Sequence, residues 1–223
     1  MIKDTIKMVV FDMAGTTVDE QNVVYKTLHK AIVAYGIETS LATVLEFGAG
    51  KEKHQAIKDI LNHLNYGVNN SNVIFENFKK MLNVAYEVLE VKPIKGVQKV
   101  ILELRSKNII VVLNTGYNRE IASLLLGKMK WKEGVHYDAL ITASDVEVGR
   151  PYPEMIEKAM KMFKIDDASS VLKAGDSAID IEEGKNAKCG VTIGVLSGAQ
   201  TKEQIIVMKP DYIIDSLADL KVS

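Results

Sequence analysis

The chain has little of what marks secreted, nucleic-acid-binding or metal-cluster proteins. Its 223 residues include one cysteine, Cys189, which excludes an intramolecular disulfide and, with four scattered histidines, a cysteine-rich zinc site. Only three of its 28 basic residues are arginines, and 29 acidic residues leave a formal net charge of −1. This balance predicts no nucleic-acid partner and no attraction to a membrane surface.

The N-terminal region has no long hydrophobic run. Its apolar stretch, residues 8–11, is too short for the core of a signal peptide or for a membrane-spanning helix. We therefore expect a cytoplasmic protein. Hydrophobic residues make up 47% of the chain, which is typical of a globular protein with one good core and a small second unit.

Four short apolar runs predict the strands of a parallel sheet. The runs are residues 8–11, 109–113, 171–174 and 191–195. Segments with helical spacing lie between them, including a stripe from Val97 to Leu104 and a helix expected over residues 153–163. Strands that alternate with helices are typical of an α/β fold with a doubly wound, Rossmann-like parallel sheet.

Residues 19–92 have a different character. They contain no convincing strand and no proline, and apolar residues recur at helical spacing over residues 24–35, 57–64 and 75–89. Residues 64–73, with Gly67 and four asparagines, are expected to be a loop between two of these helices. We predict an all-helical domain at residues 19–92, inserted into a sheet domain formed by residues 1–18 and 93–223.

The first strand ends in a polar loop that carries the main functional signal. The loop is Asp12-Met13-Ala14-Gly15-Thr16-Thr17-Val18-Asp19. In open α/β sheets, ligands bind just beyond the carboxyl ends of the strands. Asp12 therefore lies where a nucleophile is expected.

Three later segments add residues that suit a phosphoryl group or a metal ion. Residues 114–117 include Thr115, whose hydroxyl and nearby backbone N–H groups can hold a phosphoryl oxygen. Arg150 follows residues 145–148, which we expect to form a strand, and its guanidinium can grip two such oxygens. Asp176 follows the run at 171–174 and is an oxygen ligand of the kind that Mg²⁺ prefers.

In their order and spacing these motifs resemble the haloacid dehalogenase superfamily. Most members carry Asp-x-Asp-x-Thr after the first strand, whereas Ala14 holds the second position here. Asp-x-Ala-Gly-Thr, together with arginine in place of lysine at Arg150, resembles the phosphonatase-like (phosphonoacetaldehyde hydrolase-like) branch. The resemblance implies a haloacid dehalogenase core with an inserted helical cap domain.

The predicted cap carries a second motif of that branch. Phosphonatases have Gly-x-x-Lys-x-x-His, which Gly48, Lys51 and His54 match in spacing. The resemblance implies that Lys51 forms a Schiff base with a substrate aldehyde and that His54 assists. Three residues apart on a helix, the two would face the same way. The alternative is that Lys51 stays protonated and only attracts an anionic substrate.

Ala14 favours the phosphonatase-like reading on chemical grounds. In ordinary phosphatases of the superfamily, the second Asp protonates the departing alkoxide. Cleavage of a carbon–phosphorus bond through an iminium needs no such donor, because the electrons flow toward nitrogen. Three departures, Phe47 for the usual methionine, Asn22 for a frequent cysteine and a chain shorter than a typical phosphonatase, suit a phosphonatase-like relative whose substrate need not be phosphonoacetaldehyde.

The resemblance implies an Mg²⁺-dependent hydrolase that acts on a small anionic phosphonate or phosphate. Asp12 attacks phosphorus, Lys51 and His54 activate the substrate, and Asp180 supports the loop. Mg²⁺ is held by Asp12, the Ala14 carbonyl and Asp176. The residues expected to bind substrate are Ala14, Gly15, Thr16, Thr115, Gly116, Tyr117 and Arg150. A homodimer through the cap is also implied.

Three other functions stay open at this point. The first is a phosphatase of a small phosphorylated metabolite, such as a phosphoglycolate-like compound or a sugar phosphate. The second is a catalytically silent binding protein on the same fold, which the complete set of Asp12, Thr115, Arg150 and Asp176 disfavours. A haloacid dehalogenase is the least favoured, because it does not require the metal ligand Asp176.

Overall fold

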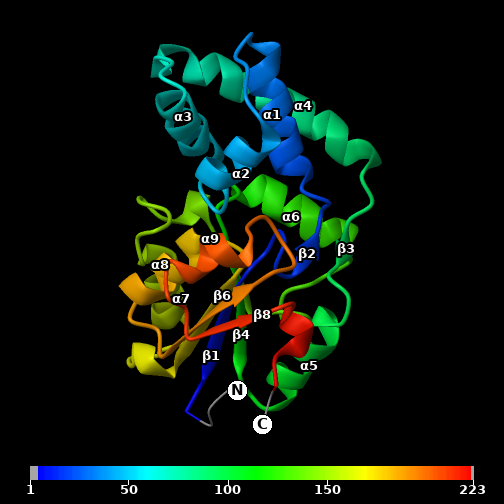
Figure 1. The fold of residues 1–223 in the computed structure, drawn as a ribbon. Helices are drawn as coiled ribbons and strands as arrows, with labels where there is room; N and C mark the ends of the chain where they lie inside the picture. Colours follow the sequence, from blue (N-terminus) through cyan, green and yellow to red (C-terminus); the bar gives the residue numbers. More distant parts are fainter. Residues whose placement is uncertain (1–4, 222–223) are drawn as a thin grey trace.

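The computed structural model describes residues 5–221 and is built around a six-stranded parallel sheet (Figure 1). The strand order is β5-β4-β1-β6-β7-β8. The strands are β1 (Met8–Asp12), β4 (Ile110–Thr115), β5 (Ala139–Thr142), β6 (Val171–Gly175), β7 (Val191–Val195) and β8 (Tyr212–Ile214). The predicted α/β fold with a parallel, doubly wound sheet is confirmed.

Both faces of the sheet are covered, because β1 is apolar on both sides. Val9 and Phe11 share a buried cluster with residues of α5 (Val97–Ser106) and α6 (Arg119–Lys128). Met8 and Val10 share another with α7 (Glu154–Met162). Burial on both faces is the normal state of a parallel sheet. The sheet domain also contains α8 (Ala178–Asn186), α9 (Lys202–Ile206), η3 (Ala168–Ser170) and η4 (Leu217–Asp219).

A separate group of helices lies beyond the carboxyl ends of the strands (Figure 1). It consists of α1 (Val23–Ala34), α2 (Leu41–Gly48), α3 (Lys53–His63), η1 (Val68–Asn70) and α4 (Ser71–Val88). We call it the helical layer. The chain enters it through β2 (Val18–Asp19) and leaves through β3 (Lys92–Pro93), which pair antiparallel. The predicted division after residues 18 and 92 falls on this pair of strands.

Several elements differ from the sequence-based expectations. Residues 145–148 are not a strand: β5 lies earlier, at Ala139–Thr142, and is followed by the 3₁₀ helix η2 (Ala143–Asp145). The cause is a local cap, because the Asp145 carboxylate accepts hydrogen bonds from the Thr142 amide and hydroxyl, both at 2.7 Å. The short elements α2, β2, β3 and β8 were not predicted, and α4 begins inside the expected 64–73 loop.

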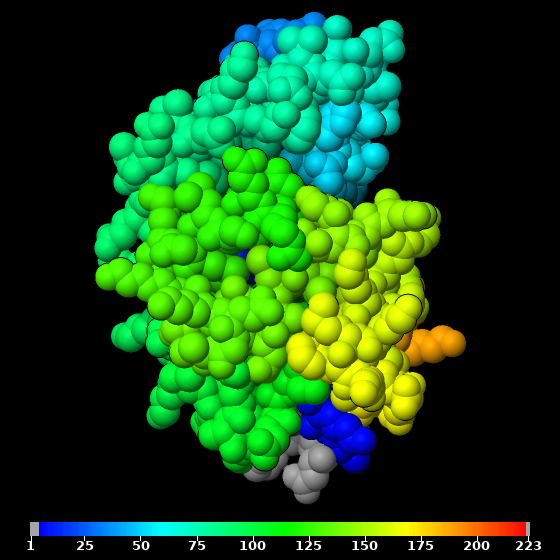
Figure 2. All heavy atoms as spheres, turned by 180° about the vertical axis from the view of Figure 1, so that it is seen from behind, coloured from blue at the N-terminus to red at the C-terminus, as the bar shows by residue number. Residues whose placement is uncertain are grey.

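Two glycines allow the helical layer to sit directly on the sheet domain. A Cβ atom added to Gly116 would lie 2.7 Å from the Gly50 carbonyl oxygen and 3.0 Å from that of Lys51. One added to Gly50, whose φ is +72°, would lie 2.6 Å from Ser177 Oγ. The turn at residues 49–51 therefore contacts the loops after β4 and β6, and the space-filling view shows the two layers in contact (Figure 2).

We expect Gly116→Ala to lower the free energy of unfolding by about 1–3 kcal/mol, because the new methyl group displaces backbone atoms that cannot rotate away. Gly127→Ala is the matched control: Gly127 lies in α6 with no atom within 4 Å of an added Cβ. That substitution should raise stability by about 0.5–1 kcal/mol through helix propensity. Urea unfolding of both variants checks this, and a stabilised Gly116→Ala protein would contradict the close contact.

Candidate active site

The carboxyl ends of β1, β4 and β6 bring the predicted site residues together. Asp12 is the last residue of β1 and is paired in register with Asn114 of β4. Thr115 ends β4, and Asp176 directly follows β6. All three predicted residues are at most 5% exposed. Asp12, Thr115 and Asp176 therefore meet in one buried region under the helical layer.

The loop after β1 folds back on itself and presses against Asp176. The amides of Thr16, Thr17 and Val18 all donate to the Met13 carbonyl oxygen, at 3.2, 2.8 and 2.8 Å. Gly15 has a φ of +81°, and a Cβ added to it would lie 2.4 Å from Asp176 Oδ2. Only glycine fits between these two loops.

Two predicted hydroxyl ligands are buried in this region. Thr16 Oγ1 is buried and has no hydrogen-bond partner within residues 5–221, so it is available to a ligand. Thr115 Oγ1 accepts a hydrogen bond from the Tyr117 amide at 3.1 Å, which shapes the 115–117 turn. Gly116 is held against the helical layer by the contact described above.

Arg150 is buried, donates four hydrogen bonds within the protein and forms an ion pair with Asp180. Nε donates to Glu183 Oε2 at 2.9 Å, and NH1 contacts Asp12 Oδ1 at 2.7 Å and Asp180 Oδ1 at 2.9 Å. NH2 donates to both oxygens of Asn114, at 3.0 and 2.5 Å. The expected two-pronged grip on a phosphoryl group is therefore not free here. Arg150 instead fixes Asp12, and it must exchange a bond to bind an anion.

A second cation, Lys173, completes a charged network that the sequence analysis missed. Lys173 is fully buried in β6, and its Nζ lies 2.7 Å from Asn114 Oδ1, 2.9 Å from Asp180 Oδ1 and 3.1 Å from Glu183 Oε2. Asp180, predicted only to support the loop, thus pairs with both Lys173 and Arg150. A signal was present, because Lys173 interrupts an apolar strand.

The charges around Asp12 are unbalanced. Four buried carboxylates (Asp12, Asp176, Asp180 and Glu183) face two buried cations (Arg150 and Lys173), so full ionisation leaves two negative charges in excess. Burial and then the charge of Asp180 raise the pKa of Asp12 to about 6, although Arg150 and Lys173 oppose the shift. Burial and the charge of Asp12 also raise the pKa of Asp176 well above its ordinary value.

This excess of negative charge fits a divalent cation. Within residues 5–221, no three His, Cys, Asp or Glu side chains come together to hold a metal by themselves. A set of two carboxylates, Asp12 and Asp176, with the Ala14 carbonyl is an oxygen-only set that suits Mg²⁺ completed by water.

The structure does not bring Lys51 and His54 together. The two are not on one helix face, because α3 begins at Lys53 and Lys51 precedes its N-cap. Lys51 Nζ pairs with Asp59 Oδ2 at 2.5 Å and is 29% exposed. His54 stacks on Phe75, with ring centroids 4.9 Å apart, and its Nε2 lies 3.2 Å from Ser71 Oγ.

The helical layer instead buries Lys53 and Glu20 near Asp12, which the sequence analysis did not single out. Lys53 is 5% exposed, with Nζ 5.2 Å from the ring centroid of Tyr25 and 5.3 Å from that of Tyr117. Burial lowers the pKa of Lys53 to about 8, while the charges of Glu52 and Asp12 act in the opposite direction. We call the group formed by Lys53, Glu20, Tyr25, Tyr86 and Tyr117 the polar cluster.

Glu20 is a buried carboxyl with one uncommitted oxygen. It is 1% exposed, and its Oε2 accepts a hydrogen bond from the Val24 amide at 3.2 Å. Its Oε1 has no hydrogen-bond partner within the described chain. Burial raises the pKa of Glu20 to about 8, so at neutral pH this group is mostly a neutral acid.

Comparison with known proteins places this site in a family. Residues 9–194 match the family model described as haloacid dehalogenase-like hydrolase. The phosphonoacetaldehyde hydrolase of Lactiplantibacillus plantarum is 33% identical over 87% of this chain and 77% of its own length. That of Bacillus cereus is 29% identical over 90% of this chain and 81% of its own length.

Solved structures with the same fold are more distant in sequence. A phosphonoacetaldehyde hydrolase-like protein from Oleispira antarctica has a TM-score of 0.85 at 22% identity, over 97% of this chain and 90% of its own. A predicted phosphoglycolate phosphatase from Haemophilus somnus has a TM-score of 0.75 at 19% identity, over 96% of both chains. No helix within residues 5–221 is long and apolar enough to span a membrane.

The Arg150 network makes a testable prediction about stability. Arg150→Lys keeps the charge but offers at most three N–H donors to four hydrogen-bond acceptors, so at least one buried acceptor loses a partner at a cost of about 1–3 kcal/mol. Arg119→Lys is the control, since the Arg119 side chain is 48% exposed, whereas Arg150 is buried, and it too bonds a carboxylate, Asp145, and a carbonyl oxygen, that of Leu140. It should change stability by about 0–1 kcal/mol. Equal losses in urea unfolding would argue against the network.

Glu20 makes a prediction about pH. Its folded-state pKa, about 8, lies above its ordinary value of 4.5, so the folded protein binds the proton more tightly than the unfolded chain does. This contribution to stability is present below pH 4.5 and is lost as the pH rises through 8, with a slope of up to about 1.4 kcal/mol per pH unit between these values.

The difference between wild type and Glu20→Gln isolates this contribution from other groups that titrate. The charged or titratable groups that act on Glu20 or are acted on by it are Asp19, Lys53, Tyr25, Tyr86 and Tyr117. The substitution removes the titrating carboxyl, so in urea unfolding from pH 5 to 8.5 the stability of the variant should fall less with rising pH than that of wild type. Parallel curves would show that Glu20 is ionised in the folded protein.

Proposed function

This chain belongs to the haloacid dehalogenase-like hydrolases, and we propose that it is an Mg²⁺-dependent hydrolase of the phosphonatase-like branch. Its reaction is cleavage of the carbon–phosphorus bond of phosphonoacetaldehyde or a related 2-oxo-phosphonate. One observation carries the proposal: Ala14 replaces the usual acid in a chain that is 33% identical to a phosphonoacetaldehyde hydrolase. A leaving group that needs no proton explains why the acid is absent.

Asp12 is the nucleophile in this proposal. Arg150 binds one of its two carboxylate oxygens, which orients the carboxylate and leaves the second oxygen to attack phosphorus. The hydroxyl groups of Thr16 and Thr115 and the backbone N–H group of Gly116 would hold the phosphoryl oxygens, as donors arranged before the reaction. Proton loss from Asp12, whose pKa is raised to about 6, is complete enough at neutral pH for attack.

Asp12, the Ala14 carbonyl and Asp176 would hold the Mg²⁺ ion. When bound, Mg²⁺ offsets the repulsion between the attacking carboxylate and the anionic phosphoryl group. The excess of two negative charges in this region supports the assignment, because Asp180 and Glu183 are already paired with Arg150 and Lys173.

A cap lysine would activate the carbonyl group of the substrate by forming an imine. The spacing of Gly48, Lys51 and His54 designates Lys51 for this role, and that assignment stays a prediction. The competing function, a phosphatase of a small phosphorylated metabolite, uses the same nucleophile and metal but needs an acid for the leaving group. Ala14 supplies none, so we rank the phosphatase second.

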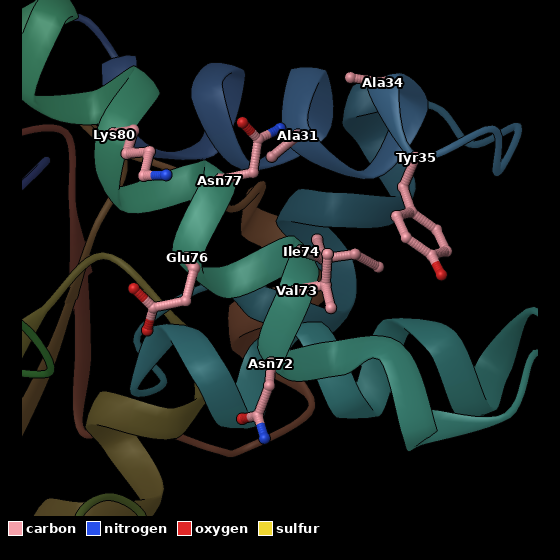
Figure 3. A pocket seen from close by; sticks show the side chains of 9 residues that line it. All are labelled: Ala31, Ala34, Tyr35, Asn72, Val73, Ile74, Glu76, Asn77 and Lys80. Atoms are coloured by element: carbon pink, nitrogen blue, oxygen red, sulfur yellow. The ribbon is translucent and has the colours of Figure 1, made fainter.

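The homodimer through the cap also stays a prediction. A groove of about 500 Å³ lies between α1 and α4, away from Asp12, with Ala31 and Asn77 on facing helices (Figure 3). Apolar side chains are exposed on both helices, including Tyr35 after α1 and Val73 in α4, at 41% and 57%. Exposed apolar area on this face supports a contact between two copies.

We expect Asp12→Asn to abolish release of phosphate from phosphonoacetaldehyde, because an amide cannot act as the nucleophile. Its stability and circular dichroism should stay near wild type, since the amide oxygen can still accept from Arg150. Excess chelator should stop the wild-type reaction and added Mg²⁺ should restore it. Turnover by the Asp12→Asn protein, or full activity in chelator, would contradict the nucleophile or the metal respectively.

A substrate panel run beside these measurements separates the two functions. Phosphonoacetaldehyde should be turned over with a higher kcat/KM than phosphoglycolate or sugar phosphates. A clear preference for a phosphate monoester would replace the phosphonatase proposal with the phosphatase.

A further inference from the structure

The turn that begins α3 carries two lysines in opposite surroundings. Lys51 is 29% exposed and its Nζ is paired with Asp59 Oδ2 at 2.5 Å. Lys53 is 5% exposed, and its Nζ donates to the Lys51 carbonyl oxygen and lies over the rings of Tyr25 and Tyr117. Of the two amines, Lys53 is the one that the fold has turned inward.

We propose that Lys53, and not Lys51, is the lysine that forms the imine with the substrate carbonyl. This inference rests on the proposed function and names the residue that performs its first covalent step. It departs from the motif spacing, which designates Lys51.

The cavity beside Lys53 borders the turn after β4, which the proposed function assigns to the phosphoryl group. It measures about 160 Å³, and its lining includes Lys53, Gly116 and Tyr117. Gly116 and Tyr117 directly follow Thr115 at the end of β4, where the phosphoryl group is expected. A two-carbon substrate whose phosphorus faces Asp12 would therefore present its carbonyl group toward the helical layer. Lys53 is the buried lysine of that layer at this place.

The surroundings of Lys53 suit an amine that must lose a proton and react. Within residues 5–221, no carboxylate lies within ion-pair distance of its Nζ, whereas Asp59 holds the Lys51 ammonium. Burial lowers the pKa of Lys53 to about 8, so a useful fraction is neutral near pH 7.5. The charged groups that face it are Glu52, Asp12, Arg150 and Glu20.

Formation of the imine requires an amine and a proton donor, and Lys53 and Glu20 supply them. The neutral Lys53 amine adds to the carbonyl carbon, one amine proton moves to the oxygen, and one further proton allows that oxygen to leave as water. Glu20, buried and mostly neutral, is a source of that proton, and its Oε1 has no partner in the described chain. The product is a protonated imine.

The following steps consume the imine without an added acid. Asp12 attacks phosphorus, and the electron pair of the C–P bond moves into the iminium to give an enamine on Lys53. One water hydrolyses the aspartyl phosphate to phosphate. The enamine takes a proton on carbon and becomes an iminium again. A second water hydrolyses this iminium and releases acetaldehyde and the free Lys53 amine. One water is released when the imine forms and two are consumed, so the net reaction uses one water.

Trapping with borohydride identifies the lysine directly. The holoenzyme with Mg²⁺ is incubated with phosphonoacetaldehyde and borohydride, then cut after glutamate, which separates Lys51 from Lys53 at Glu52. We expect the adduct on the peptide that begins with Lys53. In Asp12→Asn the adduct should retain phosphorus, because imine formation precedes C–P cleavage. Protein treated with acetaldehyde and borohydride controls for alkylation of surface lysines.

A pair of variants tests the same assignment by kinetics. Lys53→Met keeps the aliphatic volume but removes the amine, and it should lower kcat for phosphonoacetaldehyde by about 10³-fold, a larger loss than Lys51→Met causes. Urea unfolding checks that both variants fold. If Lys53→Met does not fold, the position of the adduct in the wild-type protein still shows which lysine forms the imine.

Each outcome bears on one proposal. An adduct on Lys51 overturns this inference and leaves the proposed function standing. Hydrolysis of phosphonoacetaldehyde with no adduct on either lysine overturns the proposal that the reaction passes through an imine on one of them. Absence of hydrolysis, with phosphate esters turned over instead, overturns the proposed function itself.

Discussion

The guanidinium of Arg150 is the interaction on which the rest of the site depends. It joins the end of β1 through Asp12, the end of β4 through Asn114, and α8 through Asp180 and Glu183. Buried charges are costly unless each is paired and hydrogen-bonded, so these groups cannot shift one at a time. Asp12 is held as part of this buried cluster, and its position is fixed before any substrate arrives.

The sheet domain and the helical layer contribute different chemistry. Asp12, Thr115 and Asp176 come from strand ends, where backbone hydrogen bonds hold them in register. The polar cluster comes mainly from the helical layer, with Lys53 in α3 and Glu20 just before α1. In the proposed mechanism, the layer supplies the proton transfer that Ala14 cannot perform, and the sheet domain supplies the attack on phosphorus.

The parts of this protein that could be predicted are those with a local signal. Apolar runs and helical stripes indicated the main strands and most helices, and Asp12, Thr115 and Asp176 follow from their places after strands. The strand expected at residues 145–148 was wrong because Asp145 caps the preceding turn, which alternating apolar residues do not reveal. Lys51 and Lys53 could not be told apart, because the direction of each side chain depends on where α3 begins and on Asp59, farther along that helix. The roles of Glu183 and Asn114 in the Arg150 network depend on contacts between residues far apart in the sequence, so the sequence alone does not reveal them.

The close contact of Gly50 and Gly116 has a consequence for the sequences that this fold accepts. Backbone meets backbone there, and a Cβ atom added at either position would lie 3.0 Å or less from atoms of the opposite layer. The described chain passes between the layers at β2 and β3, two residues each. A side chain at Gly50 or Gly116 would push the layers apart at the point where they meet. Both positions are therefore restricted by packing, although neither glycine carries a functional group.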